Sequence, residues 1–271
     1  MRSGSMVRRL MAACNRVRAL VLYASGTNRD RDVADALLLA GAEPEIVHIN
    51  QLLNSERNLR DYRLLVIPGG FSYGDALGAG RLLGLDIRLF FANELREFVE
   101  DGWPVIGICN GFQSLVRAGM LPGDEAGVGG TLAHNESGHF ECRWVTLAVK
   151  SDICLWTNGM TEPVYCPVAH GEGRFSLGNN MGLQELRKHD QIALIYAHPD
   201  GSPARGEYPR NPNGSLADIA GICNRAGNVL GLMPHPENHV HRFQHPRWTR
   251  SESGGMGLRL FVNGVKYAGQ M

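Results

Sequence analysis

The sequence predicts an α/β protein built on an open, mostly parallel, doubly wound sheet with helices on both faces. Three observations predict this fold. Apolar, β-branched segments alternate with helical segments between residues 18 and 116, several of these strands end in glycine-rich turns, and Trp103–Gln113 joins a buried strand to a tight Gly-x-Cys-x-Gly turn. Such alternation favours parallel strands covered by helices. After residue 119 the pattern changes, and it predicts antiparallel strands in the C-terminal half.

The first half gives its elements in a regular order. The expected strands are Arg18–Ala24, Glu45–Ile49 and Tyr62–Ile67, and the expected helices are Asp32–Ala40 and Ile87–Glu100. Each helix carries apolar residues on one face, and Gly41 and Gly102 follow the two helices where a helix end is expected. These elements predict successive strand–helix–strand units of a parallel sheet.

In the second half of the sequence the expected strands and helices do not alternate regularly. Strands are expected at 139–149, 162–169 and 191–197, a glycine-rich loop at 121–130 and a polar loop at 178–190; the segments 218–223 and 228–233 predict a hairpin, and 257–268 predicts a closing helix. No repeat or linker divides the chain. We therefore expect a single domain over residues 17–271.

The composition excludes several classes of function. With 27 basic and 27 acidic residues, the chain has no electrostatic basis for nucleic acid or an anionic membrane as its main partner. No apolar run approaches the roughly 20 residues of a membrane span. The six cysteines are scattered without a Cys-x-x-Cys pair, which favours a reducing, cytoplasmic setting. Residues 1–16 hold too short an apolar segment for export, so we expect a disordered extension or a tag remnant.

The turn Gly107-Ile-Cys109-Asn-Gly111 has the pattern of a nucleophile elbow, with cysteine as the nucleophile. The turn is so tight that a side chain at either glycine would clash. Cys109 would stand at a helix N-terminus, where free N–H groups and the helix dipole favour a thiolate. The alternative is a buried structural cysteine beside two loop glycines.

A candidate base lies in Met233-Pro-His235-Pro-Glu237, at the end of a predicted strand. In an extended His-x-Glu segment the two side chains lie on one side of the backbone, so Glu237 could orient and polarise His235. The alternative is an accidental pair, since the chain has ten histidines.

The third motif is Pro68-Gly-Gly70, also at a strand end. Glycines let the backbone approach a ligand closely, and N–H groups here could join that of Asn110 in an oxyanion hole. An ordinary turn is the alternative for this motif alone. The three motifs occur in the order Gly-Gly turn, cysteine elbow and His-Pro-Glu, and this combination favours catalysis.

This combination resembles the class I (triad-type) glutamine amidotransferases. Five segments narrow the resemblance to the glutaminase subunits of phosphoribosylformylglycinamidine synthase, namely Pro68–Asp75, Cys109–Gln113, Val168–Phe175, Asn211–Ser215 and Met233–Glu237. The resemblance extends from Val17 to the C-terminus. The chain departs from the family at Asn238, where arginine is usual, in the divergent segment Gly80–Arg88, and in the His/Arg-rich stretch His239–Arg250.

The resemblance implies a role for each motif. Cys109 attacks the carboxamide of glutamine, and His235, oriented by Glu237, protonates the leaving ammonia and later activates the water that hydrolyses the thioester. Backbone N–H groups of Gly70 or Phe71 and of Asn110 form the oxyanion hole; Gln113, His170 and Gly171 hold the amino-acid end of glutamine. Asp75 and Arg174 are expected to be structural or to face a partner.

The resemblance also implies partners. Ammonia would pass to a synthase subunit that uses ATP and Mg²⁺ to make formylglycinamidine ribonucleotide in purine biosynthesis, with a small third subunit in the complex. This chain itself carries no Walker-type phosphate loop, and no metal or cofactor is expected in it.

Two alternatives remain open from the sequence. One is a DJ-1/PfpI-like stress protein or peptidase, which uses a different cysteine elbow on a similar sheet and lacks a late His-Pro-Glu. The other is a non-catalytic scaffold subunit with the same fold, which the intact Cys109, His235 and Glu237 oppose.

Overall fold

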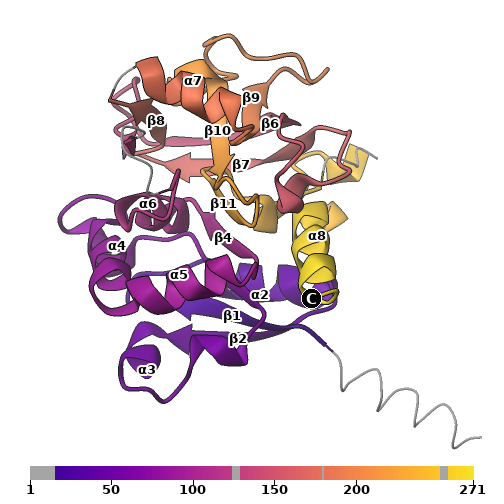
Figure 1. The fold of residues 1–271 in the computed structure, drawn as a ribbon. Helices are drawn as coiled ribbons and strands as arrows, with labels where there is room; N and C mark the ends of the chain where they lie inside the picture. Colours follow the sequence, from indigo (N-terminus) through magenta and orange to yellow (C-terminus); the bar gives the residue numbers. More distant parts are fainter. Residues whose placement is uncertain (1–15, 124–128, 179, 251–255) are drawn as a thin grey trace, which may run out of the picture.

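The structure is a computed structural model that describes residues 16–123, 129–178, 180–250 and 256–271 (Figure 1). Apart from Arg16, the expected extension over residues 1–16 lies outside the described residues. Part of the glycine-rich loop expected at 121–130 lies outside them as well.

Nine described strands form one sheet in the order β2-β1-β3-β4-β11-β10-β9-β6-β7. The first five are parallel, and the remaining four are added antiparallel. The bounds are β1 Arg18–Tyr23, β2 Glu43–His48, β3 Leu64–Ile67, β4 Val105–Ile108, β6 Glu141–Val149, β7 Val164–His170, β9 Ile192–Ala197, β10 Ile219–Cys223 and β11 Val229–Leu232. A separate antiparallel pair consists of β5 Gly130–Ala133 and β8 Arg174–Leu177.

Helices cover both faces of the parallel half, as the sequence predicts (Figure 1). On one face α2 (Asp30–Leu39) packs against α8 (Leu258–Ala268); on the other, α4 (Arg81–Asp86) packs against α6 (Asn110–Arg117). The remaining helices are α3 Ile49–Leu53, α5 Ala92–Glu100 and α7 Asn180–Lys188. Strand order reverses between β1 and β3, and ligands of such sheets bind beyond the carboxyl ends of the strands near this reversal.

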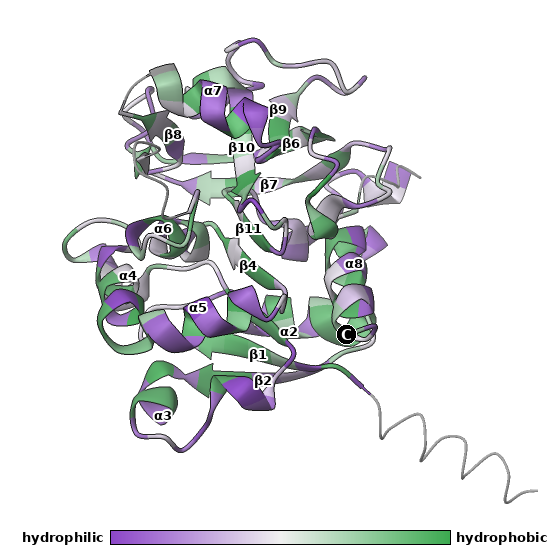
Figure 2. Ribbon diagram, in the orientation of Figure 1, coloured by the Kyte–Doolittle hydropathy of each residue, from purple (hydrophilic) through white to green (hydrophobic). Residues whose placement is uncertain are grey.

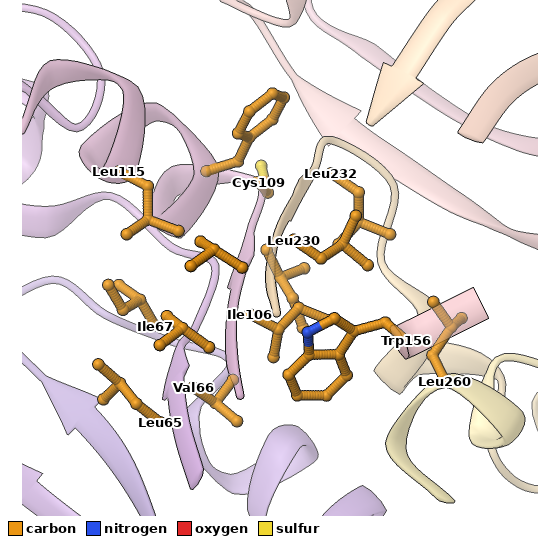
Figure 3. Close-up of a cluster of buried hydrophobic side chains, with 14 of the residues drawn as sticks. Leu65, Val66, Ile67, Ile106, Cys109, Leu115, Trp156, Leu230, Leu232 and Leu260 are labelled. Atoms are coloured by element: carbon orange, nitrogen blue, oxygen red, sulfur yellow. The ribbon is translucent and has the colours of Figure 1, made fainter. Parts of the chain in front are cut away.

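The central strands are buried on both faces, which explains their continuous apolar runs. Val66, Ile106 and Leu230 on adjacent strands are all fully buried, and Figure 3 shows them packed below Cys109. In Figure 2 apolar colour follows the inner strands, whereas polar colour lies on the outward faces of the helices. The core therefore holds the ends of β3, β4 and β11 in fixed positions.

Most expected elements are confirmed, including the hairpin of β10 and β11. The polar loop expected over 178–190 is wrong, because this segment contains α7. Leu183 and Leu186, one turn apart, face the core while charged residues face outward. The long helix also begins earlier than expected, at Arg81, and a π-helical turn over Ile87–Phe91 joins it to α5. Among the helices that the structure describes, none combines the length and apolar composition of a membrane crossing.

Candidate active site

Cys109 lies between β4 and α6, where it caps the helix with the backbone angles φ 51° and ψ −104°. A residue other than glycine at positive φ is strained, and such strain is typical of a nucleophile elbow. The two glycines around it are steric requirements, as predicted. A Cβ atom at Gly107 would lie 2.7 Å from the carbonyl oxygen of Gly111, and one at Gly111 would lie 1.9 Å from that of Ile67.

His235 follows β11, the parallel neighbour of β4. Its Nδ1 atom lies 2.7 Å from Oε1 of Glu237, and the two side chains belong to residues that are 3% and 0% exposed. The sequence analysis expected His235 and Glu237 to pair, and they do, but the backbone between them is not the extended strand that it assumed. Pro236–His239 form a turn of 3-10 helix, so the contact does not come from strand alternation.

The environment of His235 favours the charged imidazolium. Burial opposes protonation, but the negative charge of Glu237, then the charge of the nearby Cys109 sulfur, and the hydrogen bond to Glu237 raise the pKa of His235 to about 10. The other ring nitrogen, Nε2, is buried and has no protein hydrogen-bond partner among the described residues. The arrangement thus favours a charged imidazolium close to the Cys109 sulfur.

The predicted oxyanion donors lie at the ends of β3 and β4. Gly70 has φ 147°, and a Cβ atom there would lie 2.7 Å from the backbone nitrogen of Asn28. The N–H of Phe71 already donates to the carbonyl of Gly26 at 2.9 Å, whereas that of Gly70 has no partner among the described residues. Asn110 is the first residue of α6, so its N–H has no partner within the helix. Gly70 and Asn110 are therefore the better placed donors.

A cavity of about 170 Å³ opens beside the nucleophile. It is smaller than the roughly 300–1,000 Å³ of sites for drug-sized ligands, which suits a small amino acid. The structure brings Cys109 together here with all the other predicted residues except Asn110, His235 and Glu237, which are buried and do not line the cavity. The lining residues are Gly70, Phe71, Asp75, Ala79, Cys109, Gln113, Phe140, Ala169, His170, Gly171 and Glu172.

Two lining residues that the sequence associates with glutamine are engaged within the protein. The amide of Gln113 donates to the carbonyl of Glu172 at 2.6 Å and accepts from the side chain of Asn110 at 3.1 Å. The ring of His170 lies 3.1 Å from Oδ1 of Asn135 and 3.5 Å from Nδ2 of Asn213. His170 therefore orders the backbone of this wall through its side chain.

His170 is also electrically unlike His235. Burial, and then the charge of His235, lower the pKa of His170 to about 3, so the ring is neutral at physiological pH. The sequence analysis did not identify Asn135, which accepts from the backbone N–H of Gly173 at 3.0 Å. Asn213 lies within the conspicuous Asn-Pro-Asn-Gly-Ser segment and could have been found there.

The described residues contain no group of three or more His, Cys, Asp or Glu side chains that could hold a metal ion. What the site offers is a thiol beside a histidine, a carboxylate on the far side of the ring, and N–H groups at two strand ends. This is the arrangement of enzymes that cleave amides through a thioester.

The comparisons with known proteins agree with that class. The family model of the CobB/CobQ-like glutamine amidotransferase domain matches residues 16–268. Phosphoribosylformylglycinamidine synthase subunit PurQ of Treponema denticola is 53% identical over 92% of this chain and 98% of its own length. The corresponding subunit of Dehalococcoides mccartyi is 44% identical over 95% of this chain and 100% of its own.

Among solved structures, a chain of PurLQS from Thermotoga maritima is similar, with a TM-score of 0.71 and 34% identity over 93% of this chain and 99% of the other. The protein described here thus belongs to the CobB/CobQ-like glutamine amidotransferase family, and within it to the phosphoribosylformylglycinamidine synthase subunits. Membership of this family excludes the DJ-1/PfpI-like alternative.

Proposed function

We propose that this chain is the glutaminase subunit of phosphoribosylformylglycinamidine synthase and that Cys109, His235 and Glu237 are its catalytic triad. The observation that carries the proposal is the position of Cys109. It lines a small cavity, and the buried His235–Glu237 pair lies on the neighbouring strand end. The relatives at 53% and 44% identity carry the name of this synthase subunit, which supports the substrate and the pathway.

The chemistry follows from the three groups. The Cys109 thiolate attacks the carboxamide carbon of glutamine, and the carbonyl oxygen takes the negative charge. His235 then gives its proton to the departing nitrogen, ammonia leaves, and a γ-glutamyl thioester remains on Cys109. In the second half, neutral His235 takes a proton from water, hydroxide adds to the thioester, and glutamate leaves while Cys109 returns to the thiolate.

The backbone N–H groups of Gly70 and Asn110 are the proposed oxyanion donors. The N–H of Asn110 is held at the start of α6, so this donor needs little reorganisation during the reaction. The loss of one such donor costs about 10²–10³ in kcat in other enzymes.

The second reaction belongs to another polypeptide in this proposal. This chain has no Walker-type phosphate loop, so ATP and Mg²⁺ would bind the synthase partner, to which ammonia passes. A similar chain belongs to PurLQS of Thermotoga maritima, which supports an assembly with further subunits. In this proposal these subunits are the synthase and a small third subunit. A cytoplasmic location is supported by cysteines without disulfide-type spacing.

The test is Cys109→Ala in the complex reconstituted with the synthase. Glutamine-dependent amidine formation should fall by at least about 10³-fold, because the nucleophile is lost. Formation driven by high ammonium should survive, because that step occurs on the partner. The measurement is the steady-state rate with each nitrogen source.

The matched control is Cys142→Ala, which removes an exposed cysteine of β6 and should leave both rates unchanged. If Cys109→Ala left the glutamine rate intact, the chain would be the non-catalytic scaffold. If a folded Cys109→Ala complex lost both rates, the proposed division of labour would be wrong.

A further inference from the structure

We propose that Asp75 and Glu172 are the specificity residues that bind the α-ammonium group of glutamine. The inference rests on the proposed function, because it assigns roles within the same cavity. It differs from the sequence analysis, which assigned the amino-acid end of glutamine to Gln113 and to the backbone near His170 and expected Asp75 to be structural or to face a partner.

Both carboxylates line the cavity that contains Cys109. Asp75 ends the 3-10 turn Ser72–Asp75 after β3, and Glu172 lies in the turn between β7 and β8. The residues that line this cavity include no lysine or arginine, and the one histidine among them, His170, is neutral. The wall thus carries two negative groups without a balancing cation.

The orientation of this acidic wall is set by Asn110, whose side chain is buried. Its Oδ1 atom accepts from the backbone N–H and the hydroxyl of Ser72, at 3.1 and 2.6 Å. Its Nδ2 atom donates to Oδ1 of Asp75 at 3.2 Å and to Oε1 of Gln113 at 3.1 Å. The buried side-chain amide of Asn110 therefore connects two elements. It holds the turn Ser72–Asp75 against the start of α6, the helix that follows the nucleophile.

The same network removes Gln113 as the main receptor for the substrate ammonium. Its amide nitrogen donates to the carbonyl of Glu172, and its oxygen already accepts from Asn110. The carboxylate of Glu172, by contrast, receives only the N–H of Ala79, at 3.4 Å to each oxygen. Because a carboxylate offers about four lone-pair sites, most of its capacity to accept hydrogen bonds is unused by the described residues.

The charges of Asp75 and Glu172 favour binding of a cation between them. Burial and the nearby charge of Glu172 raise the pKa of Asp75, although hydrogen bonds from Gly80 and Asn110 oppose this. Two like charges in a partly buried cavity repel, and a bound ammonium relieves that repulsion with charge-assisted hydrogen bonds.

The position of the nucleophile decides which end of glutamine meets this wall. Cys109 must receive the carboxamide, so the other end, with its ammonium and carboxylate, reaches the rest of the cavity. The two acids would repel the substrate carboxylate. The ammonium is the only cationic group of glutamine, so it is the group that Asp75 and Glu172 accept.

The experiment compares glutamine with 4-carbamoylbutanoate, the same molecule without its amino group, in the reconstituted complex. Asp75→Asn and Glu172→Gln keep the size of each side chain and remove its charge. We expect the ratio of kcat/KM for glutamine to that for the analogue to fall by about 10- to 100-fold in each variant, mainly through KM for glutamine.

Glu97→Gln is the matched control, because Glu97 pairs with Arg60 on the surface and should leave the ratio unchanged. A variant that lowered both substrates equally would show a structural role and overturn the proposal. So would a wild-type complex that used the analogue as well as glutamine, a result that needs no variant to fold.

The two proposals fail in different ways. If the wild-type complex is active with ammonium and inactive with glutamine, the proposed function fails. If glutamine is used, but its preference over the analogue does not depend on Asp75 or Glu172, only this inference fails.

Discussion

Two buried histidines, His235 and His170, show how environment sets the chemistry of a side chain. Both are 3% exposed, and burial lowers the pKa of each. His235 has Glu237 and then Cys109 beside it, so its pKa nonetheless rises to about 10. His170 has neutral amides and the charged His235 near it, and its pKa falls to about 3. The sequence predicts different roles for the two histidines, but their opposite pKa shifts depend on neighbours that only the folded structure brings together.

This difference predicts two titration curves. Nitrogen NMR of histidine-labelled protein should find His235 doubly protonated at pH 7 and neutral only toward about pH 10, while His170 is neutral down to about pH 3. Because folding raises the pKa of His235, the stability from its charge is complete below about pH 6.5 and is lost as the pH rises through about 10. A neutral His235 at pH 7 would contradict the assignment.

The same experiment has a useful variant. Cys109→Ala removes the electrostatic contribution of the Cys109 sulfur, so the pKa of His235 should fall while the contact with Glu237 remains. An unchanged His235 titration would show that the thiolate does not interact with the ring.

At the scale of elements, the elbow depends on contact between two strand ends and one helix. Gly111, in the first turn of α6, lies so close to Ile67 that no side chain fits between them. This is the part of the site that the sequence predicts best, because glycine at a tight turn has a local steric cause.

Gly111→Ala should therefore destabilise the fold. Its Cβ atom would lie 1.9 Å from a backbone oxygen, which cannot move as a flexible side chain can, so the loss should be about 3 kcal/mol in the free energy of unfolding. Urea unfolding measures it. The control is Gly178→Ala, whose Cβ atom would meet nothing within 4 Å and should change the stability by about 1 kcal/mol at most. Equal losses would contradict the steric explanation.

Other elements were beyond prediction for physical reasons. The α7 segment is mostly polar, and only two leucines one turn apart mark its buried face. Two apolar residues are too few to establish the hydrophobic period of a helix from the sequence. The hydrogen bonds of Asn110 and Asn135 join residues far apart in the chain, so no local pattern reports them. The order of the motifs predicted which strand ends lie close together. The hydrogen bonds that Gln113 and Phe71 donate to backbone carbonyls within the protein could be found only from the coordinates.

At the scale of the molecule, the cavity has an apolar mouth. Phe71 and Phe140 line it and are 45% and 53% exposed, and Leu77 in the loop that follows Asp75 is 61% exposed. Exposed apolar groups around a reactive cavity are typical of a surface that a partner covers. The proposed delivery of ammonia to a synthase requires such a cover.

Coupling to that partner should be visible in the rate. Gly69 and Gly70 tolerate backbone angles of either sign, so the peptide that carries the proposed oxyanion donor can take more than one orientation. Synthase binding would select the orientation that aims the N–H at the oxyanion. The glutaminase kcat should therefore rise by about 10²–10³ on complex formation, with a smaller change in KM.

Stopped assays of the isolated chain and of the complex loaded with its nucleotide measure this rise. The wild-type complex without nucleotide serves as the control for simple stabilisation. Equal kcat in the free chain and in the loaded complex would rule out a gated oxyanion hole.

The adjacency of β4 and β11 has a consequence during synthesis of the chain. The two strands pair in parallel register, yet one belongs to the first half of the sequence and the other lies near its end. On the proposed mechanism, Cys109 lacks the imidazole that activates it while β11 is still inside the ribosome, however well the earlier strands have folded. By the same mechanism a nascent or truncated chain cannot consume glutamine, and reactivity appears only when β11 pairs with β4 in the centre of the sheet.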